Sequence, residues 1–428
     1  MKNMFIQFHS LTPFGPSLLN RDDFGRAKAI SLGGVLRTRV SSQCLKYHWR
    51  HADGPNTLQD LGEDMGSVRT RNLVTELLIP ELAEDFPADV LEVTGKIMNE
   101  AVYGQGETKK STAKKSDDDE EKEAAETKRT MLLFGMKEIA YLKERVREAA
   151  IRVSDMKTEA GIDKIDGHTK YDGELLKHPN AKYTAKQKEK GIKLIDVAKK
   201  VIAKDEQDNF KAMREKATLA GGIPGALFGR MVTGDRNADI DGAVSVAHSV
   251  TVHESEAEID PFTAVDDLVE NGSGHMGETE VNTSLFYGYT VLNIRDLLNN
   301  LGGDKELAAK IARTFVYMIA EPRMTGKTGS TAPYTRASSI VVSAGDRAPM
   351  SYVEAFRKPT GSETEEALEA MSEFATVIDH NYGIEEDRRY MLATSRVLED
   401  LPFGNQSTVA ELADWVEETV KEAADALA

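Results

Sequence analysis

The sequence is short of cysteine and of long apolar runs. Its 428 residues include a single cysteine, Cys44, which excludes a disulfide framework within the chain and any cysteine-rich zinc module. No stretch approaches the ~18 consecutive apolar residues that a membrane-spanning helix needs. The first residues also have no apolar run followed by a small-residue cleavage site, so they do not form a signal peptide. We therefore expect a protein of the reducing cytoplasm, with no membrane segment.

Signatures of catalysis are missing as well. Neither a GxGxxG nor a GxxxxGK[ST] motif stands in a strand–helix context, and no activated nucleophile is apparent. His248 and His253 are five residues apart, which places them on opposite faces of a strand, and no third ligand is near them in the sequence. The sequence therefore predicts no catalytic residue, no metal and no cofactor.

Positive charge is in the minority. The chain has 54 Lys and Arg against 71 Asp and Glu, a formal net charge of −17. A protein that binds nucleic acid without specificity is usually basic, so the whole-chain charge argues against such binding. It does not exclude a local basic site.

The order of secondary-structure signals indicates one α+β core with two insertions. Strand patterns occupy residues 4–50 and 240–345, and between them residues 56–217 have the periodicity of helices. A second, smaller excursion at 254–284 separates two strands. The expected strands are 4–11, 35–40, 244–252, 285–294 and 337–343, and the expected helices are 43–51, 305–320 and one after the Thr408–Glu411 capping box. Residues 12–34, rich in Gly and Pro, are expected to form a long loop.

Residues 104–129 have neither helical nor strand periodicity. Their centre is a mixed-charge tract rich in Ser, Lys and Glu, which cannot bury enough apolar surface to order itself. We expect a disordered, solvated loop here, and a docking tail is the alternative.

The basic residues concentrate between positions 20 and 50. This segment has a net charge of +5 and contains Arg21, Arg26, Lys28, Arg37, Arg39, Lys46 and Arg50. Arg37 and Arg39 alternate along a strand, so they are expected on one face. Lys46 and Arg50 share a helix face, and the helix start after Ser41 offers free N–H groups to an anion. These groups could follow several phosphates of one strand. The other interpretation is a solvated face paired internally with Asp22 and Asp23.

Two further segments stand out. Arg230 and Met231 precede the strand that contains His248. Phe262 and Met276 are apolar residues in the otherwise polar, Gly-rich excursion at 254–284. They either hold that projection together locally or cover something outside the core.

Three blocks in this order resemble one known family. LNRDDFGRAKAISLGGVLRTRVSSQCLKYHWR (19–50), GRM…DGA.S.AH..T.H (229–253) and DPFTAVDDL…GSGHMG (260–277) are similar to the CasC family, the backbone subunit of the type I-E CRISPR–Cas Cascade complex. The resemblance is strong over 1–50 and 227–302, looser over 303–357 and weak elsewhere.

The resemblance implies a right-hand-shaped α+β fold. It assigns an RRM-like (ferredoxin-like) palm to 1–55, 218–253 and 285–428, helical fingers to 56–217, and a β-hairpin-like thumb to 254–284. It further implies that copies of the chain form a helical oligomer along CRISPR RNA together with other Cascade subunits. The guide would then pair with a target DNA strand while the protein contacts the RNA backbone.

The resemblance also implies roles for particular residues. The expected RNA contacts are Asn20, Arg21, Lys28, Arg37, Arg39, Ser41, Ser42, Gln43, Lys46, Arg50, Arg230 and Met231, the last as a wedge at a displaced base. The expected thumb contacts are Phe262, Thr263 and Met276. Tyr47 and Pro261 depart from the family pattern, in which a basic and an aromatic residue can stand at these positions.

Two other functions compete with a non-enzymatic scaffold for antiviral defence. Related backbone subunits of RNA-targeting complexes cleave RNA with a loop aspartate, and Asp22 or Asp23 could take that role. A solitary RNA-binding regulator is the third possibility.

Overall fold

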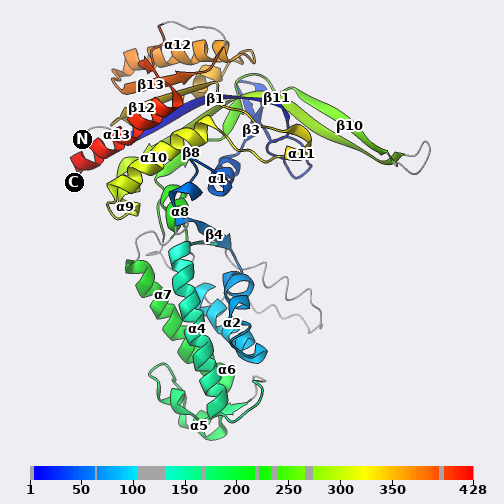
Figure 1. Ribbon diagram of the computed structural model, residues 1–428, viewed down its shortest axis with the longest axis vertical. Helices are drawn as coiled ribbons and strands as arrows, with labels where there is room; N and C mark the ends of the chain where they lie inside the picture. Colours follow the sequence, from blue (N-terminus) through cyan, green and yellow to red (C-terminus); the bar gives the residue numbers. More distant parts are fainter. Residues whose placement is uncertain are drawn as a thin grey trace. The chain divides into compact units, whose positions relative to one another are not determined.

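The computed structural model describes residues 4–62, 65–103, 131–165, 169–216, 221–232, 239–265, 273–394 and 400–427. The chain divides into two compact units, Met1–Glu63 with Gly242–Ala428, and Asp64–Asp241 (Figure 1). The predicted disordered loop at 104–129 lies outside the described residues, as does residue 130. Each unit is described below by itself.

The first unit is built on a large mixed sheet. Its strands are β1 (Phe5–Ser17), β2 (Ala29–Leu32), β3 (Val35–Val40), β8 (Val244–Val246), β9 (Ser249–Thr251), β10 (Ala257–Val265), β11 (Ser273–Asn293), β12 (Ser339–Gly345), β13 (Asp387–Leu392) and β14 (Asn405–Gln406). The main strand order is β14-β13-β12-β1-β11-β9-β3-β2, and β8 and β10 also pair with β11. Its helices are α1 (Ser42–His51), η1 (Gln59–Leu61), α9 (Ile294–Asn300), α10 (Lys305–Ala320), α11 (Thr328–Thr331), η8 (Val353–Phe356), α12 (Thr364–Tyr382) and α13 (Val409–Leu427).

Helices cover both faces of this sheet (Figure 1). Side chains alternate along a strand, so Phe8 and Leu11 point to opposite faces. Leu11 belongs to the cluster that includes Leu368 of α12. The ring of Phe8 lies 6.4 Å from that of Phe315 of α10. The sheet is therefore the middle layer of the first unit.

Strand β1 is longer than expected. Residues 12–17, expected in a loop, continue the strand and pair with β11. The residue that misleads is Pro13, which cannot donate a ladder hydrogen bond. Pairing with β12 ends at Leu11, so Pro13 is paired with β11 but has no partner strand on its other side. A missing N–H on that unpaired side costs little.

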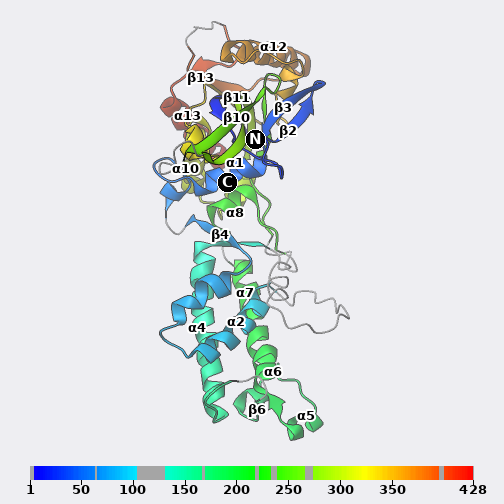
Figure 2. The same ribbon diagram turned by 90° about the vertical axis from the view of Figure 1, so that its right-hand side faces the viewer.

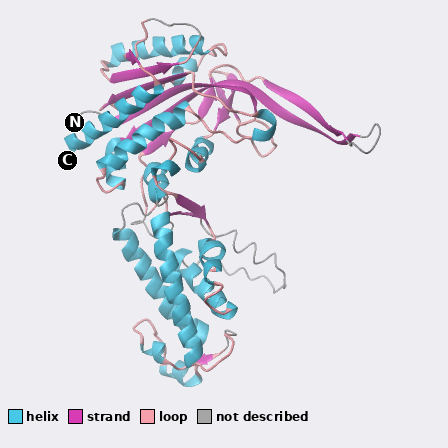
Figure 3. Cartoon of the chain, in the orientation of Figure 1, coloured by secondary structure: helices cyan, strands magenta, loops and turns pink. Residues whose placement is uncertain are grey.

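The second unit is mainly helical (Figure 2, Figure 3). Its elements are β4 (Ser67–Thr70), η3 (Leu73–Leu78), η4 (Pro80–Leu82), α2 (Ala88–Tyr103), β5 (Leu132–Gly135), α4 (Met136–Glu159), β6 (Lys170–Tyr171), η5 (Glu174–Lys177), α5 (Ala185–Lys190), β7 (Ile192–Lys193), α6 (Leu194–Ala198), η6 (Lys199–Ala203), α7 (Lys204–Lys216) and α8 (Gly222–Phe228). One apolar cluster joins α2, α4 and α7 through residues such as Ile97, Val146 and Phe210.

The predicted mixed α+β class and several predicted ends are confirmed. Ser41 caps α1 by accepting the Cys44 N–H at 3.2 Å, and Asp304 caps α10 by accepting the Leu307 N–H at 3.0 Å. Thr408 and Glu411 form both bonds of the expected capping box. One boundary differs, because the described residues within 218–241, a range assigned to the palm from the sequence, belong to the helical unit.

Candidate nucleic-acid interface

A backbone network ties the loop at 18–28 to β3 and α1. The side-chain oxygen of Asn20 accepts the Ser41 N–H at 3.0 Å, and the carbonyl of Asn20 accepts the Lys28 N–H at 2.8 Å. The carbonyl of Lys28 in turn accepts the Arg39 N–H at 2.8 Å. Three segments of the basic region are therefore held in one fixed arrangement. Asn20 connects these segments, because it accepts hydrogen bonds from both Ser41 and Lys28.

The cations of this region meet at His248, which lies between β8 and β9. The Nδ1 atom of His248 lies 3.1 Å from Nη1 of Arg39 and 3.3 Å from the backbone nitrogen of Ser42. Partial desolvation by its neighbours lowers the pKa of His248, and the charges of Arg39 and Lys28 lower it further. The two contacts of Nδ1 place Arg39 and the start of α1 side by side.

For four cations of the basic segment, the structure does not show the internal salt bridges of the alternative interpretation. Among the described residues, no carboxylate forms an ion pair with Arg21, Arg26, Lys28 or Arg39. Asp22 instead accepts the N–H groups of Phe24 and Arg26 at 2.9 Å each, which closes a turn. The four cations therefore form no ion pair with a carboxylate in the described part of the chain.

Arg37 requires a correction. Its side chain is fully buried, and it donates to the carbonyl oxygens of Thr251 at 3.2 Å and Phe356 at 2.8 Å. Burial lowers its pKa, and the charge of Glu254 opposes that shift. Arg37 and Arg39 are thus not equivalent. The expected surface contact of Arg37 is excluded because its guanidinium is inside the unit.

Lys46 and Arg50 lie on α1 as expected, but their face is half-buried rather than exposed. An adjacent face of α1 packs Trp49 against Phe315, with ring centroids 5.4 Å apart. Ser42 is half-buried and Gln43 is exposed in the first turn. The exposed ring of Tyr47 stacks on His51 at 4.2 Å, so this departure from the family pattern adds an aromatic surface to α1.

Gly33 and Gly34 also have a structural role. Both have positive φ, 65° and 87°, in the two-residue turn between β2 and β3. A Cβ at Gly33 would lie 1.6 Å from the carbonyl oxygen of Arg357. At this turn the backbone therefore closely approaches another segment of the chain itself.

Arg230 and Met231 belong to the second unit and differ sharply. Arg230 is buried and forms an ion pair with the buried Glu138 at 2.8 Å, so the prediction that it contacts RNA is corrected to a structural role. The side chain of Met231 is 78% exposed. It remains available for the predicted wedge.

The predicted projection at 254–284 contains a two-stranded hairpin of β10 and β11. Phe262 pairs with Gly277, and Thr263 pairs with Met276. Met276 is 72% exposed and Phe262 is 45% exposed. A Cβ at Gly277 would lie 2.5 Å from the Phe262 ring, so this glycine leaves room for the ring. The base of the hairpin is joined to the basic loop, because Glu280 accepts the Ala27 N–H at 3.2 Å.

Phe24 is a residue that the sequence analysis missed. Its side chain is 89% exposed at the tip of the turn that Asp22 closes. Arg21 and Arg26 flank it in the sequence. The signal for it was an aromatic residue in a basic loop, and only the structure shows that the turn presents the ring to solvent.

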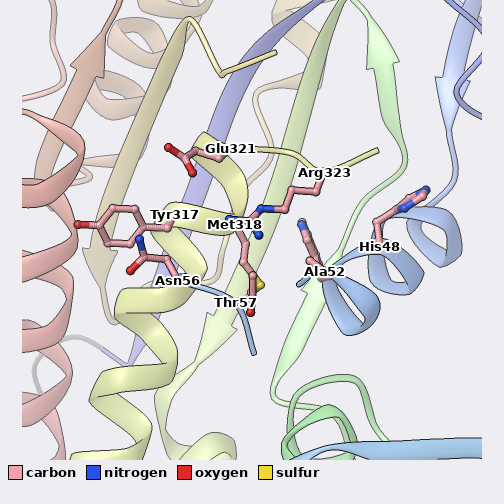
Figure 4. A pocket seen from close by; sticks show the side chains of 9 residues that line it. His48, Ala52, Asn56, Thr57, Tyr317, Met318, Glu321 and Arg323 are labelled. Atoms are coloured by element: carbon pink, nitrogen blue, oxygen red, sulfur yellow. The ribbon is translucent and has the colours of Figure 1, made fainter. Parts of the chain in front are cut away.

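Two small pockets adjoin this region. One, of about 230 Å³ including its mouth, is lined by Asn20, Arg39 and Asn282 among others, and the side-chain oxygen of Asn282 has no hydrogen-bond partner there. The other, of about 260 Å³, lies between α1 and the end of α10 (Figure 4). Arg323 closes it by donating to the carbonyl of Pro55 at 3.0 Å. Neither pocket gathers groups typical of catalysis.

The described residues contain no group of three or more side chains that could hold a metal ion. His253 does not pair with His248, since its Nε2 accepts the Leu285 N–H at 3.1 Å and its Nδ1 contacts the Glu254 carbonyl. No helix in the described ranges is long and apolar enough to cross a membrane.

Comparison with known proteins adds three findings. A family model described as "CT1975-like protein" matches residues 6–417. A chain of a solved "CRISPR RNA-guided surveillance complex, pre-nicking" shares the fold with a TM-score of 0.71 at 24% identity, and the match covers 97% of this chain and 100% of that one. A chain of a "CRISPR RNA-guided surveillance complex" gives a TM-score of 0.60 at 21% identity, covering 97% and 99%. No curated protein sequence matches the chain.

Proposed function

The chain belongs to the CT1975-like protein family, and we propose on this basis that it is an RNA-binding backbone subunit of a Cascade-type, RNA-guided complex. In this proposal it binds CRISPR RNA through the phosphate backbone and performs no catalysis. Its partners are further copies of itself, other Cascade subunits, and a target DNA strand that pairs with the guide. The assignment to type I-E belongs to the same proposal.

One observation carries the proposal. In a chain with a net charge of −17, Arg21, Arg26, Lys28 and Arg39 lie on one hydrogen-bonded framework and form no ion pair with a carboxylate among the described residues. Keeping like charges close together costs free energy unless an anion neutralises them. A single-stranded polyanion satisfies this requirement, because its phosphates are spaced along one line. The start of α1 adds N–H groups that favour the same ligand.

The first unit would act as the RRM-like palm and the β10–β11 hairpin as the thumb. The exposed Phe262 and Met276 suit contact with unstacked bases or with a neighbouring copy. The second unit would supply the fingers, with Met231 as the wedge. Of the two loop aspartates that could support a nuclease, Asp22 accepts two N–H groups of its own turn.

The test compares two charge-matched double variants. Lys28→Gln with Arg39→Gln removes two cations of the interface, and Lys310→Gln with Arg347→Gln removes two exposed cations elsewhere in the first unit. Affinity for a single-stranded RNA is measured by fluorescence anisotropy at several salt concentrations. Each lost phosphate contact should reduce the slope of log K against log salt by ~0.7, so we expect a loss of ~1.4 in the first variant only.

Three outcomes would contradict the proposal. Absence of RNA binding by the wild-type chain would refute RNA recognition. Equal slopes in both double variants would show that only net charge matters. Cleavage of RNA complementary to a bound guide in the presence of Mg²⁺ or Mn²⁺, lost in Asp22→Asn or Asp23→Asn, would refute the non-enzymatic role.

A further inference from the structure

Two hydrogen-bond donors converge on a single acceptor atom at the interface. Nη1 of Arg39 lies 3.1 Å and the Ser42 nitrogen 3.3 Å from Nδ1 of His248. A ring nitrogen can accept these bonds only when it has no proton. The ring of His248 is exposed and thus held in place mainly by these two contacts. Its Nδ1 occupies the position where both donors point.

A guanidinium and a backbone N–H at a helix start are the donors that proteins commonly direct at a phosphate oxygen. We propose that Nδ1 of His248 holds the place of a phosphate oxygen in the free protein, and that RNA binding displaces the imidazole from Arg39 and Ser42. This inference rests on the proposed function. It adds a competitor inside the chain to the RNA contacts named above.

The competition depends on pH with a defined sign. Protonation turns Nδ1 into a donor, so the imidazolium cannot accept from Arg39 or Ser42 and releases both. The charged groups that face His248 are Arg39 of β3 and Lys28 of the preceding loop, and both lower its pKa; α1 meets it through the Ser42 amide, which does not titrate. A phosphate docked among these cations acts in the opposite direction. RNA binding therefore takes up a proton, and affinity increases as the pH falls toward the pKa of His248.

Three variants separate competition from support. His248→Asn keeps an acceptor oxygen near the position of Nδ1 but cannot titrate. His248→Ala removes the acceptor. His380→Asn makes the first substitution at an exposed histidine in α12 and serves as the control. RNA affinity is measured by anisotropy from pH 8 to pH 6 at constant salt, with circular dichroism to confirm that each protein is folded at each pH.

We expect the wild type and His380→Asn to gain affinity in parallel as the pH falls. His248→Asn should bind like the wild type at pH 8 and gain clearly less at pH 6. At pH 8, His248→Ala should bind RNA at least as tightly as the wild type. Its affinity should be higher by up to about tenfold, which corresponds to the loss of one competing charge-assisted hydrogen bond.

Two results would overturn the inference. Weaker binding by folded His248→Ala at pH 8 would show that the imidazole supports Arg39 rather than competes with RNA. Identical pH profiles for the wild type and both His248 variants would show that this residue is not linked to binding. Neither result affects the proposed function, which is tested separately by the three outcomes named above, beginning with RNA binding by the wild type.

Discussion

Arg37 and Arg39 lie two residues apart on β3, and the structure predicts opposite consequences for their substitution. Arg37→Met should destabilise the first unit without weakening RNA binding by the folded protein. Arg39→Met should weaken RNA binding with little effect on stability. Methionine preserves most of the aliphatic length of arginine in both variants, so the comparison isolates the guanidinium.

The expected magnitude follows from the contacts of Arg37. Its guanidinium donates two buried hydrogen bonds to carbonyl oxygens, and hydrogen bonds of charged groups contribute ~1.5–3 kcal/mol each. Burying the methionine side chain offsets part of the loss. We therefore expect a destabilisation of about 2–4 kcal/mol. In a unit of about 250 residues, each kcal/mol shifts the melting temperature by ~2–4 °C, so the transition should move down by about 4–16 °C.

Thermal unfolding followed by circular dichroism measures the first effect, and RNA anisotropy well below the transition measures the second. Arg39→Met should lose affinity and reduce the salt slope by ~0.7. The reasoning is refuted if folded Arg37→Met loses as much RNA affinity as Arg39→Met. It is equally refuted if both variants melt at the temperature of the wild type.

Three further predictions concern other parts of the molecule. Arg230→Met leaves the carboxylate of Glu138 buried without its partner, which should cost about 3–5 kcal/mol in urea unfolding of the second unit; adding Glu138→Gln should recover much of this. Burial, with the charge of Arg388, lowers the pKa of His9 from 6.5 to about 3. The unfolded chain therefore takes up this proton first, and stability should fall from pH 6.5 to pH 5 by up to ~1.4 kcal/mol per pH unit, less steeply in His9→Gln. Phe24→Ala should weaken RNA binding by ~1–3 kcal/mol, measured by anisotropy, if the ring stacks on a base, and leave the melting temperature unchanged.

The elements that the sequence predicted well are those with local signals. The capping residues of α1, α10 and α13 accept hydrogen bonds from N–H groups in the first turn of their own helix, so their positions depend on only a few neighbouring residues. The excursion at 254–284 is predicted for a similar reason, because its polar, Gly-rich sequence differs from that of the buried strands, whereas its hairpin form was implied by the family resemblance alone. The length of β1 was underestimated, since the tolerance of Pro13 depends on where its neighbour β12 ends.

The basic segment shows where such reasoning stops. Alternation along β3 placed Arg37 and Arg39 on one face, but it could not tell which elements cover that face at each position. The carbonyls of Thr251 and Phe356 that receive Arg37 come from segments more than 200 residues away in the sequence. The same holds for Arg230, whose partner Glu138 is 92 residues distant. Contacts with residues distant in the sequence therefore decide which of these arginines are buried and structural and which stay at the surface.

The acidic composition leads to a last prediction about assembly. Copies with a net charge of −17 repel one another, and the hairpin itself is acidic, with Glu258, Asp260, Glu278 and Glu280 along its strands. If copies assemble along one RNA as proposed, we expect their attraction to come from apolar contacts such as those of Phe262 and Met276, and the affinity of each copy for RNA to come from its cations.

Salt should separate these two contributions. Binding to an RNA that holds one copy should weaken steeply between 50 and 200 mM salt, because phosphate contacts release counterions. The cooperativity on an RNA that holds several copies should stay constant or increase, because salt screens repulsion and leaves apolar contacts intact. Sedimentation with RNAs of increasing length measures both, and Phe262→Ala with Met276→Ala should reduce the cooperativity alone. Cooperativity that falls with salt as steeply as the intrinsic affinity would show instead that charge pairs join the copies.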